Sequence, residues 1–97
     1  MKILGIGRPR PGTTQEKMMA MLKDEAMAGW QQYAAGTFRE VYLRPDGGGA
    51  VVILECADTA AAKKIFDVLP MVKAGLTEFE IIPLGPFLAF GALFAQS

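Results

Sequence analysis

The chain has 97 residues, the length of one domain, and 52% of them are hydrophobic. Ten basic and ten acidic residues cancel, and neither sign clusters along the chain, which argues against a nucleic-acid-binding protein. Histidine is absent and Cys56 is the single cysteine, so we expect no zinc site, no Ser-His or Cys-His catalytic pair and no internal disulfide.

The ends of the chain bear on its location. The N-terminal segment lacks the basic stretch and apolar run of a signal peptide. The apolar stretch from Phe87 to Ala95 has about half of the roughly 20 residues needed to cross a bilayer. A single cysteine also fits a reducing compartment. These features predict a cytoplasmic protein that does not bind membranes, and no pattern indicates a metal ion or a cofactor.

The N-terminal third predicts a strand followed by a long helix. Lys2–Gly7 is rich in Ile and Leu, as in a buried strand, and a Pro-rich loop follows it. Thr13 and Glu16 have the spacing of a capping box, so we expect the helix to begin there, and Gly36 is expected to end it. The helix has one broad apolar face, which is expected to pack on the sheet and consists of Met18, Met19, Leu22, Ala26, Gly29, Trp30 and Tyr33.

The rest of the chain predicts a hairpin, a short helix and a last strand. Thr37–Arg44 and Ala50–Cys56 are strand-like in composition, and the sequence PDGGG between them is a strong turn signal. Asp58 has the position of an N-cap for an alanine-rich helix, which Pro70 is expected to end. Glu78–Leu84 then predicts the final strand.

The resulting order, β-α-β-β-α-β, predicts an α+β domain of the ferredoxin-like type with an antiparallel sheet over residues 1–86. Its helices cover one face of the sheet. Ala50–Cys56 is apolar on both faces as far as Glu55, so we expect the uncovered face to pack on the sheet of a second copy. Two such sheets form a dimeric α+β barrel with a cavity between each sheet and its helices. We therefore expect a homodimer or a higher homo-oligomer.

Residues 87–97 form an apolar tail beyond the last strand. Phe87, Phe90 and Phe94 recur at i, i+3 and i+7, which places them on one stripe of a helix. A domain of this size has no spare core for them, and burying the three side chains would contribute about 5–9 kcal/mol gross. We expect the tail to pack on a partner subunit. The alternative is a tail that folds over its own sheet and closes the cavity.

A family resemblance rests on two stretches of the chain. One is the run from Arg39 to Pro70, with its hairpin, its Asp58-capped helix and its Leu-Pro ending, and the other is the phrase LPMVKAGLTEFEIIPLGPF. They resemble the muconolactone isomerase-like branch of the dimeric α+β-barrel proteins, and the resemblance covers residues 13–87. It implies proton transfer within an unsaturated lactone, without cofactor or metal, in a pocket near subunit contacts. The histidines of the isomerase pattern have no counterpart here, and Glu40 stands in the aligned part of the second strand.

Glu40 and Tyr42 are the expected catalytic residues. They alternate on one face of the second strand with Phe38 beside them. If this face looks into the cavity, apolar surroundings would raise the pKa of Glu40 and suit it to a proton transfer next to a carbonyl. Tyr42 could donate a hydrogen bond to the developing enolate oxygen. The alternative is that Glu40 is solvated at a sheet edge or paired with an arginine.

The residues expected to contact a substrate are Arg8, Phe38, Arg39 and Trp30. Arg8 would steer an anionic ligand at the mouth of the cavity, unless it is simply solvated. Arg39 would hold a carboxylate, but a cross-strand ion pair with Glu55 is the favoured interpretation, and a shifted register would pair Arg39 with Leu54. Trp30 either closes the core between helix and sheet or borders the pocket.

The sequence therefore predicts a cofactor-independent enzyme that transfers a proton on a small, partly apolar carbonyl or lactone compound. Two alternatives stay open. One is a non-catalytic module of the same fold, which binds a small apolar or anionic ligand or mediates assembly. The other is a cofactorless oxygenase on the same scaffold.

Overall fold

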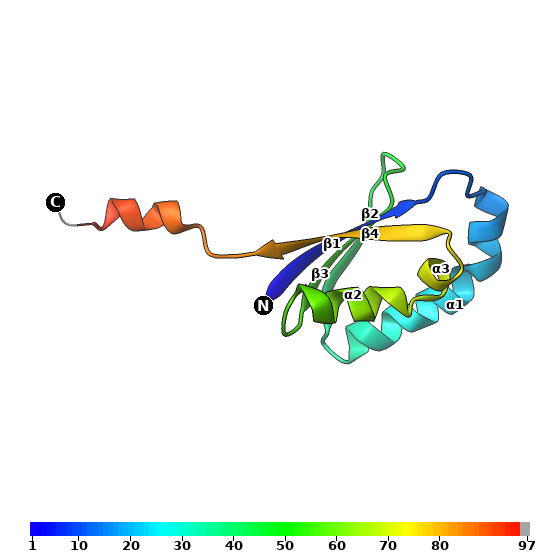
Figure 1. The fold of residues 1–97 in the computed structure, drawn as a ribbon, viewed down its shortest axis with the longest axis horizontal. Coiled ribbons are helices and arrows are strands. Elements are labelled where there is room, and N and C mark those ends of the chain that lie inside the picture. Colours follow the sequence, from blue (N-terminus) through cyan, green and yellow to red (C-terminus); the bar gives the residue numbers. More distant parts are fainter. Residues whose placement is uncertain (96–97) are drawn as a thin grey trace.

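The computed structural model describes residues 1–95 and confirms the predicted α+β fold (Figure 1). Within this range no helix is both long enough and apolar enough to span a bilayer. The order β-α-β-β-α-β is extended by a short helix before the last strand and by a 3₁₀ helix in the tail. The elements are β1 (Lys2–Pro9), α1 (Gln15–Ala34), β2 (Phe38–Leu43), β3 (Ala50–Glu55), α2 (Thr59–Asp67), α3 (Pro70–Lys73), β4 (Thr77–Leu84) and the 3₁₀ helix η1 (Leu88–Leu93).

The four strands form one antiparallel sheet in the order β2-β3-β1-β4. Figure 1 shows α1, α2 and α3 on one face of this sheet, so its other face is uncovered, as expected. The core lies between the sheet and the helices, because strand alternation turns one set of apolar side chains toward α2. Its most buried members are Ile3, Phe38, Val52, Leu54, Ala62 and Phe66.

Two glycines of β1 make room for the aromatic part of this core. A Cβ atom at Gly5 would collide with the ring of Phe66, and one at Gly7 would lie 2.7 Å from the ring of Phe79. Those two rings stack with their centroids 4.1 Å apart. The glycines of β1 therefore serve the close packing of α2 and β4 against the strand.

The predicted helix boundaries at Thr13 and Pro70 are both wrong. Thr14 is the N-cap of α1, and its hydroxyl accepts a hydrogen bond from the Lys17 N–H at 3.2 Å. The Thr13 hydroxyl instead donates to the Leu76 carbonyl at 2.9 Å, which fastens the loop to the start of β4. Pro70 does not end α2, which stops earlier. It begins α3, where its missing N–H costs nothing at the first helical position.

The predicted apolar face of α1 does not pack into the core. None of the described α1 side chains is buried, and Leu22, Trp30 and Tyr33 each expose about half of their surface or more. Ala28, which was not placed on that face, is the α1 residue that packs against the core cluster. Of the two positions predicted for Trp30, the one in the core is wrong, because the apolar stripe is rotated away from the line of contact.

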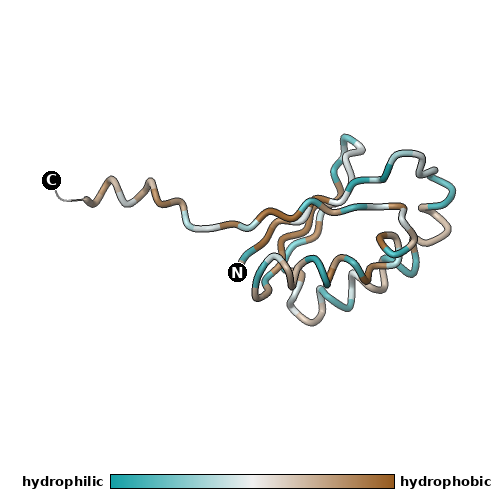
Figure 2. The backbone as a smooth tube through the Cα atoms, in the orientation of Figure 1, coloured by the Kyte–Doolittle hydropathy of each residue, from teal (hydrophilic) through white to brown (hydrophobic). Residues whose placement is uncertain are grey.

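The tail projects from the end of β4, away from the sheet and the helices (Figure 1, Figure 2). The radius of gyration is 16.0 Å, against about 13 Å for a compact domain of this length. Leu88–Leu93 forms a 3₁₀ helix. Its three residues per turn place Phe87 and Phe90 in one row and Phe94 in another, so the three do not share a stripe. The predicted tail also included residues 96 and 97, which lie outside the described residues.

Candidate functional site

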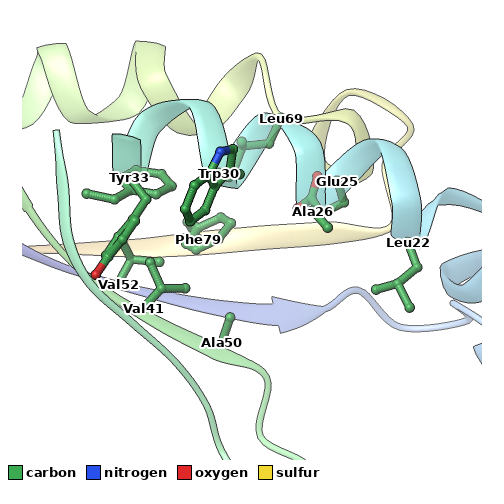
Figure 3. Close-up of a pocket in the computed structure, with 12 residues that line it drawn as sticks. Leu22, Glu25, Ala26, Trp30, Tyr33, Val41, Ala50, Val52, Leu69 and Phe79 are labelled. Atoms are coloured by element: carbon green, nitrogen blue, oxygen red, sulfur yellow. The ribbon is translucent and has the colours of Figure 1, made fainter. Parts of the chain in front are cut away.

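A cavity of about 340 Å³ lies between α1 and the sheet (Figure 3). This volume is within the range of small-molecule sites. One wall comes from α1, and the opposite side comes from β2, β3 and β4. The lining residues are Leu22, Glu25, Ala26, Gly29, Trp30, Tyr33, Phe38, Val41, Ala50, Val52, Leu69 and Phe79.

Small side chains on both walls create this hollow. Ala26 and Gly29 lie on α1, and Ala50 lies on β3 opposite them. A Cβ atom added at Gly29 would find no heavy atom within 4 Å. Val41 and Val52 are paired across β2 and β3, so both point to the same side of the sheet and form the floor. The result is an apolar slot with room for a small compound.

Glu25 brings a charge into this apolar slot. Among the described lining residues it is the one with a charged side chain. Partial burial in the cavity raises the pKa of the Glu25 carboxyl, while a hydrogen bond from the Met71 N–H lowers it by a smaller amount. A carboxylate with a raised pKa in a cavity is a candidate general acid or base.

The same carboxylate also has a structural task. Glu25 Oε1 accepts a hydrogen bond from the Met71 N–H at 3.1 Å, in the first turn of α3. Leu69, the N-cap residue of α3, has no side chain that could accept from this turn. Glu25 therefore caps α3 from a different helix, which explains how a carboxylate is tolerated there. One carboxylate oxygen remains for other partners.

Two aromatic side chains border the cavity on the α1 side. Figure 3 shows Trp30 and Tyr33 extending from α1 toward the strands. Their ring centroids are 5.7 Å apart. The Trp30 indole N–H and the Tyr33 hydroxyl are the neutral side-chain hydrogen-bond donors of the described lining. These rings offer flat apolar surface and two polar groups to a ligand.

A second hollow, of about 530 Å³, lies at the other end of α1, between the loop after β1 and the hairpin turn. Its described lining includes Thr13, Thr14 and Gln15 but no charged side chain. The cavity at Glu25 is the better candidate for chemistry because it combines an apolar enclosure with an ionisable group.

The structure separates the predicted site residues into two groups. Phe38 and Trp30 line the cavity. Glu40 and Tyr42 pair with Ile53 and Val51, and all four point to the uncovered face of the sheet. The placement of Phe38 on the same face as Glu40 and Tyr42 is wrong, because a β-bulge lies between positions 38 and 40 and shifts the alternation by one residue.

Glu40 and Tyr42 contact each other on that uncovered face. The Tyr42 hydroxyl donates to Glu40 Oε1 at 2.7 Å, and both side chains are exposed. This hydrogen bond, together with the negative charge of Glu40, raises the pKa of Tyr42. The pair lies on the opposite side of the sheet from the cavity.

The two predicted arginines lie away from the cavity as well. Arg39 is the extra residue of the bulge and donates to the Gly36 carbonyl, so neither predicted partner, Glu55 or Leu54, is opposite it. Glu55 instead pairs with the N-terminal ammonium group at 3.4 Å. Arg8 forms an ion pair with Glu80 at 3.0 Å on the uncovered face, and it is not among the lining residues of the cavity.

Glu25 is not among the residues predicted for the site, although the sequence contains a signal for it. Glu25 lies three residues after Leu22 and four before Gly29, which is the spacing of the apolar face of α1. A carboxylate at such a position can accept a hydrogen bond from the end of another helix, or it can face a cavity as an ionisable group. Glu25 does both.

No protein-family model matches the chain, and no curated protein matches it. Among solved structures, the fold is similar to that of 5-chloro-2-hydroxyhydroquinone dehydrochlorinase (TftG) from Burkholderia phenoliruptrix AC1100, in complex with 2,5-dihydroxybenzoquinone. The TM-score is 0.73 at 16% identity, and the match covers 88% of this chain and 94% of that one. At this identity the similarity establishes the fold and neither the activity nor the muconolactone isomerase-like branch. The chain is an α+β protein with the fold of the dimeric α+β-barrel proteins.

Proposed function

We propose that this chain is a cofactor-independent enzyme that transfers a proton on a small, flat carbonyl compound bound between α1 and the sheet. The observation that carries the proposal is a single carboxylate, Glu25, with a raised pKa in an otherwise apolar cavity of about 340 Å³. The ring compound named with the structurally similar dehydrochlorinase is of this size and kind, which supports the substrate class.

In the proposed reaction Glu25 is the general base. Its free carboxylate oxygen takes a proton from a carbon α or γ to the carbonyl. The electron pair of that C–H bond forms a new carbon–carbon double bond, and the π electrons of the carbonyl, directly or through the conjugated double bond, move to its oxygen. Trp30 and Tyr33 can donate hydrogen bonds to the resulting enolate. Return of the proton to a different carbon completes an isomerisation, as in the lactone chemistry of the muconolactone isomerase-like branch. The base is Glu25 and not Glu40, because Glu40 lies across the sheet from the cavity.

We also propose that the working unit is a homodimer in which the uncovered sheet faces meet. Apolar side chains occupy the centre of this face, including Leu4, Ile6, Val51, Ile53 and Ile82. The ion pair of Arg8 with Glu80 and that of Arg10 with Glu78 lie toward one side of it. Stacking on a second copy would remove the apolar centre from water.

The decisive experiment measures hydrogen exchange on candidate substrates. The chain is incubated in D₂O with 2,5-dihydroxybenzoquinone, an unsaturated lactone and a cyclic enone, and loss of each C–H signal is followed by proton NMR. We expect exchange of a proton next to a carbonyl in at least one of them. Glu25→Gln should abolish this exchange while keeping the cap on α3, because the Gln carbonyl oxygen still accepts from Met71.

Glu40→Gln is the matched control, since it removes the same charge from the opposite face of the sheet. It should exchange at the wild-type rate. The proposal fails if Glu25→Gln exchanges as fast as the wild type, or if Glu40→Gln is the variant that loses exchange.

A non-catalytic ligand-binding module is the second candidate. It is favoured by the hydrogen bond from Met71, which already gives Glu25 a structural reason to be present. Such a protein would bind 2,5-dihydroxybenzoquinone, seen as quenching of Trp30 fluorescence, without exchange of any C–H proton in the wild type. Oxygen uptake in the presence of a quinol would instead support a cofactorless oxygenase.

A further inference from the structure

Apolar side chains are exposed around the mouth of the cavity. Trp30 is 61% exposed, and Leu22, Tyr33 and Val41 are each exposed by about half. Leu43, which pairs with Ala50 and so points to the helix side of β2, is 80% exposed. A contiguous patch of this kind on a domain of this size marks a surface that another molecule covers.

The tail, which the structure describes over residues 87–95, is the second apolar surface without a partner in the single chain. Its five large side chains, Phe87, Leu88, Phe90, Leu93 and Phe94, are between 63% and 82% exposed. No residue from 85 to 95 carries a charge. Figure 2 shows this largely apolar segment extended away from the domain. A tail of this composition in water requires an apolar surface to cover it.

The side chains of the 3₁₀ helix line up in three rows along its axis, two with large apolar residues and one with alanines. With three residues per turn, Phe87, Phe90 and Leu93 align, and Leu88 aligns with Phe94. The remaining row consists of alanines, at positions 89, 92 and 95. Phe87 and Phe90 already contact each other edge to face, with centroids 4.8 Å apart. The large rows form a preformed apolar surface and the alanine row forms its back.

We propose that these two surfaces cover each other between subunits: the tail of one subunit lies across the cavity mouth of its partner. The row of Phe87, Phe90 and Leu93 then packs on Trp30 and Tyr33 and supplies the missing wall of the cavity. This inference rests on the pairing of two copies proposed above, and it makes each site a composite of two chains.

The sheet order explains why the tail reaches the partner and not its own cavity. The tail leaves from β4 at one edge, whereas the mouth lies beside β2 at the other edge. Three strand spacings, about 14 Å, separate these edges. Pro83 and Pro86 also favour an extended path away from the domain.

A second copy brings the two surfaces together. If two sheets stack about a two-fold axis parallel to their strands, the strand order reverses, and β4 of one subunit faces β2 of the other. Because Leu84 pairs at the same level as Glu55, the tail then leaves where the partner's β2 begins, beside the end of the partner's α1 that carries Trp30 and Tyr33. In this arrangement each tail lies beside an edge strand of the other subunit, which protects the unpaired backbone groups at the edges of the sheets.

The first test uses Trp30, the one tryptophan in the sequence, as the reporter. In the full-length wild type we expect blue-shifted emission and protection from acrylamide quenching. Phe90→Asp should shift the emission to the red and remove the protection. Ala89→Asp places the same charge on the alanine row and should behave as the wild type. Equal spectra for Phe90→Asp and the wild type would overturn the proposal.

The second test identifies the chain that supplies the tail. In a Cys56→Ala background, one chain carries Phe90→Cys and the other carries Val41→Cys with an added mass tag. The two are mixed, allowed to exchange subunits and oxidised. We expect a covalent heterodimer on a non-reducing gel, and Ala89→Cys in place of Phe90→Cys should give much less of it.

The outcomes separate this inference from the proposals on which it rests. A dimer by sedimentation without the heterodimer cross-link overturns the tail placement and leaves the pairing of sheets intact. A cross-link within one chain that carries both cysteines, with no heterodimer, shows a tail that closes its own cavity and also overturns the inference. A wild type that sediments as a monomer overturns the pairing and the tail placement together, while the exchange assay still decides the chemistry.

Discussion

The carboxylate of Glu25 experiences two opposing influences. The apolar cavity disfavours its charge and raises its pKa above the usual value for a glutamate, and the hydrogen bond from the Met71 N–H partly compensates. Since the pKa of a free glutamate in an unfolded chain is not raised, the folded state binds a proton more tightly than the unfolded state. The stability of the protein is therefore linked to the ionisation of this one group.

The sign of this linkage gives a prediction for the pH dependence of stability. Below pH 4.5 Glu25 is protonated in both states, so it imposes no penalty on folding. As the pH rises above 4.5 through the raised pKa, the folded state must ionise a half-buried carboxyl, and this group lowers the free energy of unfolding. We expect the stability of Glu25→Gln relative to the wild type to increase over this range, measured by urea denaturation at a series of pH values.

Comparison of the two proteins at each pH cancels the contributions of the other carboxyl groups. A constant difference between Glu25→Gln and the wild type across the range would show that the cavity does not perturb Glu25.

The raised pKa of Glu25 also predicts that the rate of catalysed hydrogen exchange rises with pH, since only the ionised carboxylate acts as a base.

Part of the candidate site was predictable from residue types. Phe38 and Trp30 were expected to contact a ligand, and both line the cavity, because large aromatic residues on a strand and a helix of this fold face the space between layers. Glu40 and Tyr42 were placed wrongly relative to Phe38, because a bulge leaves no mark in the hydrophobic pattern. Glu25 was missed, because its partner, the Met71 N–H, lies 46 positions away in the sequence.

The elements themselves followed from local chemistry. The Gly-rich turn between β2 and β3 and the Asp58 cap of α2 occur where they were predicted, and Gly36, with φ of 82°, ends α1. These features depend on contacts within a few residues, so the sequence specifies them directly. The side of α1 that faces the sheet depends on contacts with distant residues, such as the hydrogen bond between Glu25 and Met71, which no local pattern contains.

The start of α1 gives a prediction at a single capping residue. Thr14→Ala removes the acceptor for the Lys17 N–H, and we expect the free energy of unfolding to fall by about 1 kcal/mol. Thr14→Ser keeps the hydroxyl and should remain close to the wild type. Urea denaturation of the three proteins makes the comparison. If Thr14→Ala and Thr14→Ser are equally stable, the hydroxyl is not a cap.

The assembly of the whole molecule depends on the uncovered face of the sheet. Ile53 lies on this face in β3, paired with Leu4 on one side and with Glu40 on the other. Ile53→Lys places a charged side chain at the proposed contact between the two sheets, beside Glu40 and against the apolar centre of the second copy, where burial of a charge is costly. We expect this variant to sediment as a monomer at micromolar concentration, whereas the wild type sediments as a dimer.

Val68→Lys is the control for this experiment. Val68 is 61% exposed at the end of α2, in the helix layer, so it adds the same charge on the other side of the molecule. It should remain dimeric. Dissociation of both variants would point to a general loss of structure, and a dimeric Ile53→Lys would show that the sheets do not meet.

The irregularity at Arg39 has a practical outcome for mutagenesis of this strand. Phe38 ahead of the bulge and Val41 beyond it share the helix side, although one number is even and the other odd. A mutational scan that assumed unbroken alternation would group Phe38 with Glu40 and Tyr42. It would then attribute to one site the effects of substitutions on two opposite faces of the sheet. Removal of that single residue would leave Phe38 and Glu40 opposite consecutive residues of β3, so a regular strand would keep every side chain from position 40 onward on the face it has now.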